Sequence, residues 1–383
     1  MNWSNEKSIL KRNCKRLSIF LFTYLSAIVC FSQDTINYQG VPLSEYWKQS
    51  EVPLLGQLVP VNQINLQKGV HLFDIETIGK QWQGLTNPFD TMGLGSFDTQ
   101  NQEAIIRLRY AYPLARYTYI GVTAGFASRS EAELYHESGM IDPEIFIGQH
   151  IPWRNGNFRL SLTASPSIGP SEVKRSISID SDSATGNFNR GGWSIRPEAS
   201  VTARVNKFLF GAEVNYLYMG ERTINEDITV TQEALLDPDI QTSLTHQYFG
   251  YNQSQFGFGS NGLAGSSGFE NGQTIQTTVT GGNAWAIKGL LEIPDWYRVG
   301  GEIIYGQIDS SLRKNDFGKE VQNEGGDFQE VRLYGRYKFS DNMSLTPLIS
   351  WMPSLPLTRG QQRIESTQDV WGFQLTFRSK FEL

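Results

Sequence analysis

Large apolar residues occupy every second position in many short stretches of this chain, and polar or charged residues fill the positions between them. In the last stretch, Trp371, Phe373 and Leu375 alternate with Gly372 and Gln374. A period of two indicates a β-strand whose two faces meet different surroundings. In a soluble sheet the apolar face covers a core, whereas in a membrane barrel it meets lipid and the polar side chains point into the lumen.

The alternation predicts about twelve strands, each near the length that a tilted strand needs to cross a membrane. They are 70–78, 104–112, 118–127, 144–152, 158–165, 193–205, 208–219, 284–293, 297–307, 328–339, 343–352 and 370–383. Pro197 and Pro347 lie inside two of these strands. Because proline cannot donate to the ladder, we expect a bulge or a local shift at each.

Short and long connections alternate between the predicted strands. The short ones begin at 113, 154, 206, 294 and 340, and the long ones are 79–103, 128–143, 166–192, 220–283, 308–327 and 353–369. A barrel threaded from the periplasm has short periplasmic turns and long extracellular loops, and its outward aromatic residues gather at the two membrane interfaces. The predicted outward aromatics also gather near the strand ends, so the pattern favours a membrane barrel over a soluble sandwich.

On these strands, turns and aromatics, the chain resembles bacterial outer-membrane β-barrel proteins of channel or porin type over nearly all of residues 69–383. The resemblance implies an all-β fold, a transmembrane antiparallel up-and-down barrel, located in the cell outer membrane of a Gram-negative bacterium. The last strand resembles the one that the barrel assembly machinery recognises in this class, although Leu383 stands at the end in place of an aromatic residue. The implied partners are outer-membrane lipid, that machinery and small polar solutes.

The first 32 residues have the order of a secretory signal peptide. Basic residues precede the apolar run "LSIFLFTYLSAIVCF", which is too short to span a bilayer comfortably. We expect cleavage near Ser32, with a lipid-anchored Cys30 as the alternative. Residues 33–68 lack clean alternation until their end, and they fit a periplasmic tail, a plug segment or an extension of the first strand.

Composition narrows the possible functions. The formal net charge is -6, and the signal segment is itself basic, so the exported chain is acidic and we expect no nucleic-acid partner. Both cysteines, Cys14 and Cys30, lie in the signal segment, so the mature chain has no thiol for a disulfide, a zinc site or a nucleophile. We expect no cofactor and no metal. A mean hydropathy of -0.34 fits a barrel, because only half of each strand meets lipid.

Charged residues fall on the inward positions of the predicted strands. The candidate lumen-lining residues are Arg107, Arg109, Arg196, Glu198, Glu213, Lys288, Glu302, Arg332, Tyr334 and Arg336. Counting from the turns places Lys288 level with Glu302, and Tyr334 level with both. Two interpretations stay open: a structural ion network that fills the lumen, or charged rings that select solutes in a narrow pore, with an arginine excess favouring anions.

Two further features bear on function. The stretch 245–273 of the long 220–283 connection mixes aromatic residues with Gly, Asn, Gln and Ser, which suits either a surface-binding loop or an unstructured one. Its flanks, "DITVT" and "TIQTTVT", predict strands that continue above the membrane. We expect no enzyme activity, although a lipid-modifying barrel is a lesser alternative, with His71 or His150 as the base.

Overall fold

The computed structural model describes residues 69–84, 99–131, 135–179, 182–237, 240, 272–293, 298–323, 325–353, 356–359, 362–365 and 370–382. The predicted signal peptide (1–32), the segment 33–68 and the loop tip from 245 to 271 lie outside these residues. The predictions made for those three segments therefore stay predictions.

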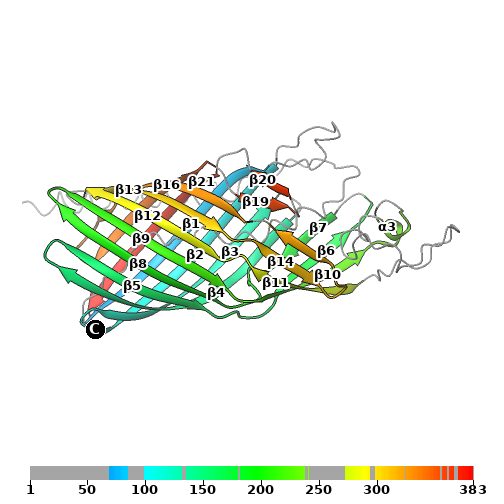
Figure 1. The fold of residues 1–383 in the computed structure, drawn as a ribbon, viewed down its shortest axis with the longest axis horizontal. Helices are drawn as coiled ribbons and strands as arrows, with labels where there is room; N and C mark the ends of the chain where they lie inside the picture. Colours follow the sequence, from blue (N-terminus) through cyan, green and yellow to red (C-terminus); the bar gives the residue numbers. More distant parts are fainter. Residues whose placement is uncertain are drawn as a thin grey trace, which may run out of the picture. The chain divides into compact units, whose positions relative to one another are not determined.

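Twelve antiparallel strands form a closed barrel (Figure 1). They are β1 (Val70–Gly84), β2 (Thr99–Ala115), β3 (Thr118–Glu131), β4 (Tyr135–Trp153), β5 (Gly156–Ser165), β8 (Ser194–Val205), β9 (Phe208–Met219), β12 (Ala284–Ile293), β13 (Val299–Ile308), β16 (Gly326–Tyr334) with its continuation β17 (Tyr337–Lys338), β18 (Met343–Met352) and β21 (Val370–Glu382). Each pairs with the next in chain order, and β21 returns to pair with β1. The predicted fold class and all twelve predicted strands are confirmed.

The barrel has a turn end and a loop end. At the turn end, tight turns join β2 to β3, β4 to β5 and β8 to β9. Asn206, in the last of these turns, has a left-handed φ of 56°, which asparagine tolerates better than most residues. The opposite end, where the long connections lie, is the loop end.

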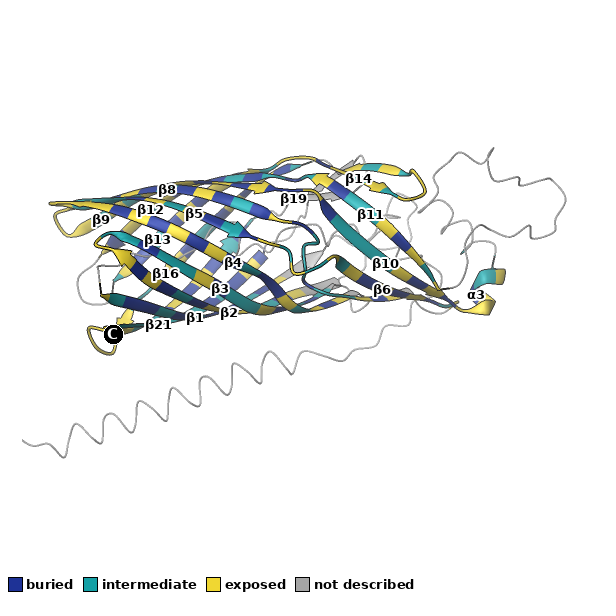
Figure 2. Cartoon of the chain, turned by 90° about the horizontal axis from the view of Figure 1, so that it is seen from below, coloured by how far each residue is buried: buried dark blue, intermediate teal, exposed yellow. Residues whose placement is uncertain are grey.

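Burial alternates along the strands, as the blue and yellow segments of Figure 2 show. Ile303 and Leu333 are 68% and 64% exposed on the outer face, whereas the neighbouring Ile304 and Arg332 are 0% and 2% exposed inside. Apolar side chains outside and charges inside reverse the arrangement of a soluble sheet and match a barrel that spans a membrane.

No helix among the described residues has both the length and the apolar character to cross a membrane.

Outward aromatic residues pack in pairs near both ends of the strands. Toward the loop end, the rings of Trp193 and Tyr218 have centroids 5.3 Å apart, and those of Trp351 and Trp371 lie 6.3 Å apart. Toward the turn end, Tyr337 and Phe339 meet edge to face, and Phe208 packs near Phe210. Rings at both strand ends are expected where a barrel crosses the two membrane interfaces.

Strands replace much of the predicted loops at the loop end. In the predicted loop 128–143, residues 128–131 and 135–143 instead belong to β3 and β4, whose ends pair with each other. Strands β1 and β2 also run well into the predicted loop 79–103. The ladder continues because backbone groups pair wherever two strands stay adjacent, whereas the apolar alternation is needed only against lipid. Alternation therefore underestimates strand length on this side.

Further hairpins extend the wall at the loop end. We call this set the rim extension: β6 (Ser171–Ile177), β7 (Asp182–Gly186), β10 (Arg222–Val230), β11 (Gln273–Gly281), β14 (Ser311–Asn315) and β15 (Glu320–Asn323). Two of its joints are parallel, β4 with β7 and β6 with β10, and β11 pairs antiparallel with β14. The paired strands predicted from "DITVT" and "TIQTTVT" are β10 and β11. A separate hairpin joins β19 (Pro356–Arg359) to β20 (Gln362–Glu365).

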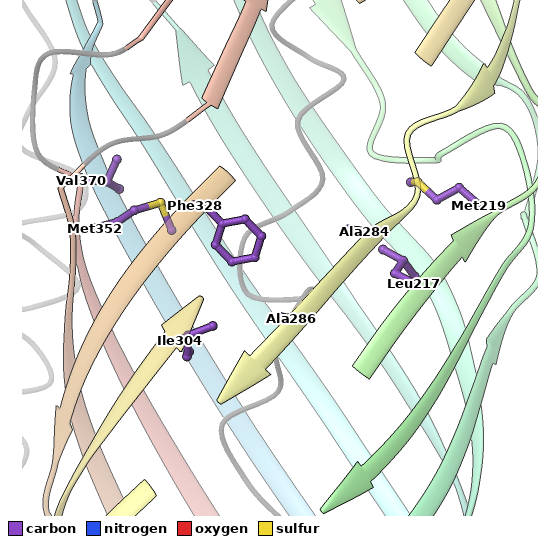
Figure 3. Close-up of a cluster of buried hydrophobic side chains, with 8 residues drawn as sticks. All are labelled: Leu217, Met219, Ala284, Ala286, Ile304, Phe328, Met352 and Val370. Carbon is purple, nitrogen blue, oxygen red and sulfur yellow. The ribbon is translucent and has the colours of Figure 1, made fainter. Parts of the chain in front are cut away.

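Two apolar clusters lie near the loop end. One belongs to the rim extension and includes Ile177, Ile228 and Ile275, with Ala234 of the short helix α3 (Gln232–Leu236). The other lies on the inner face of the barrel, where six strands contribute side chains that include Phe328, Ile304 and Met352 (Figure 3). On these six strands, the inner face is therefore apolar toward the loop end.

Neither strand proline shifts the register. The β8 and β9 ladder lacks the pairs at Arg196 and Pro197, but the pairing is in the same register on both sides of the gap. Opposite Pro347, the neighbouring strand breaks into β16 and β17, again with an unchanged register. The missing N–H interrupts the ladder locally but leaves the register unchanged, so the predicted bulge or local shift is wrong at both prolines.

Candidate functional site

All ten candidate lumen-lining residues point into the barrel. Nine of them are buried, and Arg336 is half-buried. Strand periodicity places them, because every second residue of an antiparallel strand faces the same side. The inward face of β1 adds three buried charged residues that were not predicted, Asp74, Glu76 and Lys80. The same period of two would have found them.

A continuous series of ion pairs crosses the inner face, and we call it the charged band. Its first half joins β1, β16 and β13. Lys80 Nζ lies 3.5 Å from Glu330 Oε1, and Arg332 Nη2 lies 2.7 Å from Glu330 Oε2. Arg332 Nη1 lies 3.6 Å from Glu302 Oε2. Arg332 therefore has a carboxylate on each side.

The second half of the band joins β13, β12, β9, β5 and β8. Lys288 Nζ lies 3.0 Å from Glu213 Oε1 and 3.9 Å from Glu302 Oε1. Arg159 Nη2 lies 3.3 Å from Glu213 Oε2, and it also pairs with Glu198. Glu213 therefore bridges two cations. Buried charges require such partners, since desolvation of an unpaired charge is costly.

The observed register corrects the predicted levels. Lys288 faces Ile304, and the residue that faces Glu302 on β16 is Arg332, while Tyr334 faces Gly300. The pairing of β12 with β13 is centred one residue later than Asp295, which moves every facing pair by two positions. Tyr334 therefore bonds elsewhere: its hydroxyl donates to Glu292 Oε2 at 2.7 Å.

A second ion cluster lies where the last strand meets the first two. Arg378 Nη2 lies 2.8 Å from Asp74 Oδ2, and Arg109 Nη1 lies 3.7 Å from the same oxygen. Arg107 Nη2 lies 2.6 Å from Glu76 Oε2. The cluster thus places the predicted Arg107 and Arg109 apart from the charged band.

Arg196 belongs to a third group, nearer the loop end. Its Nη1 lies 3.6 Å from Glu144 Oε1 on β4. Next to it, Asp142 accepts hydrogen bonds from the backbone N–H groups of Ile168 and Arg190, at 3.0 and 2.9 Å. Burial lowers the pKa of the Arg190 guanidinium from its ordinary value, and the charges of Glu144 and Asp142 oppose this shift. Carboxylates on β4 therefore anchor the segments that lead into the rim extension.

The described buried side chains carry no excess of cations. They include eleven carboxylates and ten lysines and arginines together. The charged band therefore supplies a balanced field, and the predicted anion preference does not follow from it.

Inward glycines lie opposite aromatic rings, a feature that the sequence analysis did not use. Gly300 faces Tyr334 and Gly306 faces Phe328 across β13 and β16, and Gly121 faces Phe146 across β3 and β4. A Cβ atom at each of these glycines would overlap the facing ring. The glycines leave room for the facing aromatic rings to lie across the ladder. An inward glycine that faces an inward aromatic residue on the next strand would be the pattern that predicts this packing from the sequence.

The two histidines named as candidate bases lie among aromatic rings. His71 Nδ1 is 2.7 Å from Tyr110 Oη, and the His71 ring stacks on Phe381 with centroids 5.4 Å apart. His150 lies 5.1 Å from the ring of Tyr117. Within the described ranges, no cluster of His, Cys, Asp and Glu could hold a metal ion.

Comparisons with known proteins give similarities of structure only. No family model matches the chain, and no curated protein matches its sequence. An outer-membrane channel from Pseudomonas putida F1 aligns over 84% of this chain and 99% of its own, with 9% identity and a TM-score of 0.49. The NanC porin aligns over 79% and 98%, with 9% identity and a TM-score of 0.36. The TodX monoaromatic hydrocarbon channel aligns over 83% and 91%, with 7% identity and a TM-score of 0.41.

At these identities and TM-scores, the comparisons do not decide what the chain transports or binds. The closed twelve-strand antiparallel barrel itself confirms the resemblance to outer-membrane β-barrel proteins at the level of fold. Function must therefore be argued from the inner face and the two ends of the barrel.

Proposed function

We propose that this protein is a narrow passive channel for small polar solutes in the outer membrane of a Gram-negative bacterium. The observation that carries the proposal is the charged band, which lies inside a closed barrel whose outer face is apolar. Charges on the inside of a membrane barrel act on a passing solute by their electric field. In this proposal, the turn end faces the periplasm and the loop end faces the medium.

The size of the barrel favours small solutes. Eight strands leave room for side chains or one small ligand, and sixteen strands leave an open aqueous channel, so twelve strands lie between these cases. The side chains of the band are buried, and Lys80 reaches Glu330 across the two strands that lie between them. A solute can pass only where these pairs leave space, so we expect low unitary conductance.

Planar-bilayer recording of the refolded mature chain tests the proposal. We expect stepwise ionic currents with small unitary conductance. Bilayers that receive the same detergent without protein are the control. If circular dichroism and gel mobility show a folded, inserted barrel but no steps occur over a wide voltage range, the channel proposal fails.

The rim extension favours a second candidate, a closed barrel that binds a partner at the cell surface. Its hairpins are joined by ladder pairs and have their own apolar cluster, so they form a fixed platform. A closed barrel would be electrically silent. Deletion of β10, β11 and the segment between them would then abolish partner binding while leaving the barrel folded.

A further inference from the structure

Basic residues gather at the turn end of the barrel, below the charged band. Arg298 precedes β13, Arg336 lies between β16 and β17, Lys338 is in β17 and Lys380 is near the end of β21. The last three take the inward register of their strands. Arg298, Arg336 and Lys380 are half-buried and Lys338 is exposed, unlike the buried cations of the band. We call these four residues the basic mouth.

A backbone hydrogen bond and an unusual backbone conformation position Arg298 and Arg336 of the basic mouth. The N–H of Arg336 donates to the carbonyl of Arg298 at 3.3 Å, where Pro347 has already broken the neighbouring ladder. Arg298 has a φ of 41°, a left-handed conformation that is rare for a residue other than glycine. Such strained conformations gather at functional sites. The local backbone therefore departs from a regular strand to place these two side chains.

The other two residues complete the arrangement. Lys338 faces Ser344 of β18, and Ser344 faces Arg378 of β21. The N–H of Lys380 donates to the carbonyl of Asn342 at 2.7 Å. Lys338 and Lys380 therefore flank β18 on its two sides, and Arg298 is bonded through its backbone to Arg336. Cations from three elements are thus brought together at the turn end.

Among the residues that the structure describes, no ion pair joins the basic mouth to a carboxylate. Glu292 is the carboxylate that acts on Arg336, and it already accepts the hydroxyl of Tyr334. Asp74 is held by Arg378. Repulsion among like charges is relieved when an anion binds between them, and lysine and arginine are the residues that bind oxyanions best.

We propose that the basic mouth is a binding site for small oxyanions, of the phosphate, sulfate or carboxylate class, at the turn end of the lumen. Its role as a selectivity filter rests on the proposed channel function, whereas its ability to bind oxyanions does not. Arg332 is not part of the site, because carboxylates on both sides already neutralise it. Anion preference is therefore set at one mouth of the barrel and not at its middle.

Phosphate binding tests the site without any current. The mature chain in phospholipid-free detergent is titrated with inorganic phosphate by calorimetry, at constant ionic strength. We expect saturable binding that weakens by at least about thirtyfold in the double variant Arg336→Gln, Lys380→Gln, because each change removes a charged donor to the anion. Lys207→Gln is the matched control, since Lys207 is an exposed cation in a tight turn at the same end. It should bind phosphate like the wild type.

Several outcomes overturn the site. They are an absence of saturable binding in the wild type, equal binding in the double variant, and binding only when phosphatidylglycerol replaces inorganic phosphate. The last would mean that the cations face lipid headgroups and not the lumen. A single Lys338→Gln variant, at the most exposed position, repeats the comparison if the double variant does not fold.

Reversal potentials then separate the site from the channel. Under a KCl gradient we expect the wild type to favour chloride, the double variant to lose that preference, and Lys207→Gln to keep it. Phosphate binding without any current would support the site and defeat the channel. Currents whose selectivity is the same in the wild type and the double variant would defeat the filter.

Discussion

Arg378 and Asp74 form a bidentate ion pair in which Nε and Nη2 each lie 2.8 Å from a carboxylate oxygen. The two residues face each other across the seam where β21 pairs with β1 and closes the barrel. Paired donors and acceptors of this kind fix both distance and orientation. The ion pair therefore helps to set the register in which the last strand meets the first.

Removal of the carboxylate at this seam should destabilise the barrel. In Asp74→Asn, Arg378 and Arg109 lose their shared counter-ion inside the barrel, so we expect a loss of about 3–5 kcal/mol in the free energy of unfolding. Urea unfolding in lipid vesicles measures it. Glu320→Gln is the control, because Glu320 and Lys314 form a pair whose side chains are 52% and 60% exposed, and such pairs are worth at most about 1 kcal/mol. Equal effects of the two changes would contradict the assignment.

Single cysteines should report the direction of neighbouring side chains. No cysteine follows Cys30, so an introduced thiol is unique in the mature chain. Ile303→Cys places it on the exposed outer face, and Ile304→Cys places it inside. In vesicles, we expect a lipid-partitioning maleimide to label the first position and not the second. Rapid labelling of Ile303→Cys by a membrane-impermeant reagent would show that this face meets water.

Arg332 on β16 and Arg336 just after this strand should respond differently to substitution by glutamine. Arg332→Gln leaves Glu302 and Glu330 buried without their shared cation, and we expect a loss of about 3–5 kcal/mol. Arg336 is half-buried and forms no ion pair with any described residue, so Arg336→Gln should cost less than about 1 kcal/mol. Denaturation in vesicles compares the two variants directly. Similar losses would mean that Arg336 is structural as well.

The glycine beneath Tyr334 should not tolerate a side chain. In Gly300→Val the new atoms overlap the tyrosine ring, which must move away from Glu292, and we expect a cost of about 1–3 kcal/mol. Gly289→Ala is the control, because nothing lies within 4 Å of a Cβ there. Its effect should stay below about 0.5 kcal/mol in the same unfolding assay. Equal effects at the two glycines would argue against close packing on the inner face.

The lipid-facing part of the fold was predictable because lipid imposes one rule on every strand. Ile303 and Leu333 must be apolar whatever lies inside, so a period of two marks each crossing. The rim extension follows this rule only in β10 and β11, whose alternation was recognised. In β14, for example, Leu312 is followed by Arg313, Lys314 and Asn315, and no alternation remains to be recognised.

The ion pairs among the inward-facing charged residues were not predictable, because a small error in strand register changes the partners. The turn at Asp295 is one residue too early, so it pairs Lys288 with Glu302 in place of Ile304. Counting equal heights from two turns also ignores the stagger of tilted strands, so it places Glu302 level with Tyr334 although it faces Arg332. The inward faces themselves stay correct. The best contact of Lys288 is Glu213, which approaches from the other side. Side-chain reach and strand tilt decide such choices, and neither can be deduced from spacing alone.

The parallel joints of the rim extension constrain the order in which the protein assembles. The strands of β6 and β10 belong to separate hairpins, and the main ladder runs through β8 and β9 before the chain reaches β10. Because contacts between distant segments form slowly, we expect the joint between β6 and β10 to form after the hairpin of β8 and β9. A chain stalled during insertion would consequently have an incomplete rim extension. A ligand that needs the complete rim extension would then distinguish mature molecules from intermediates.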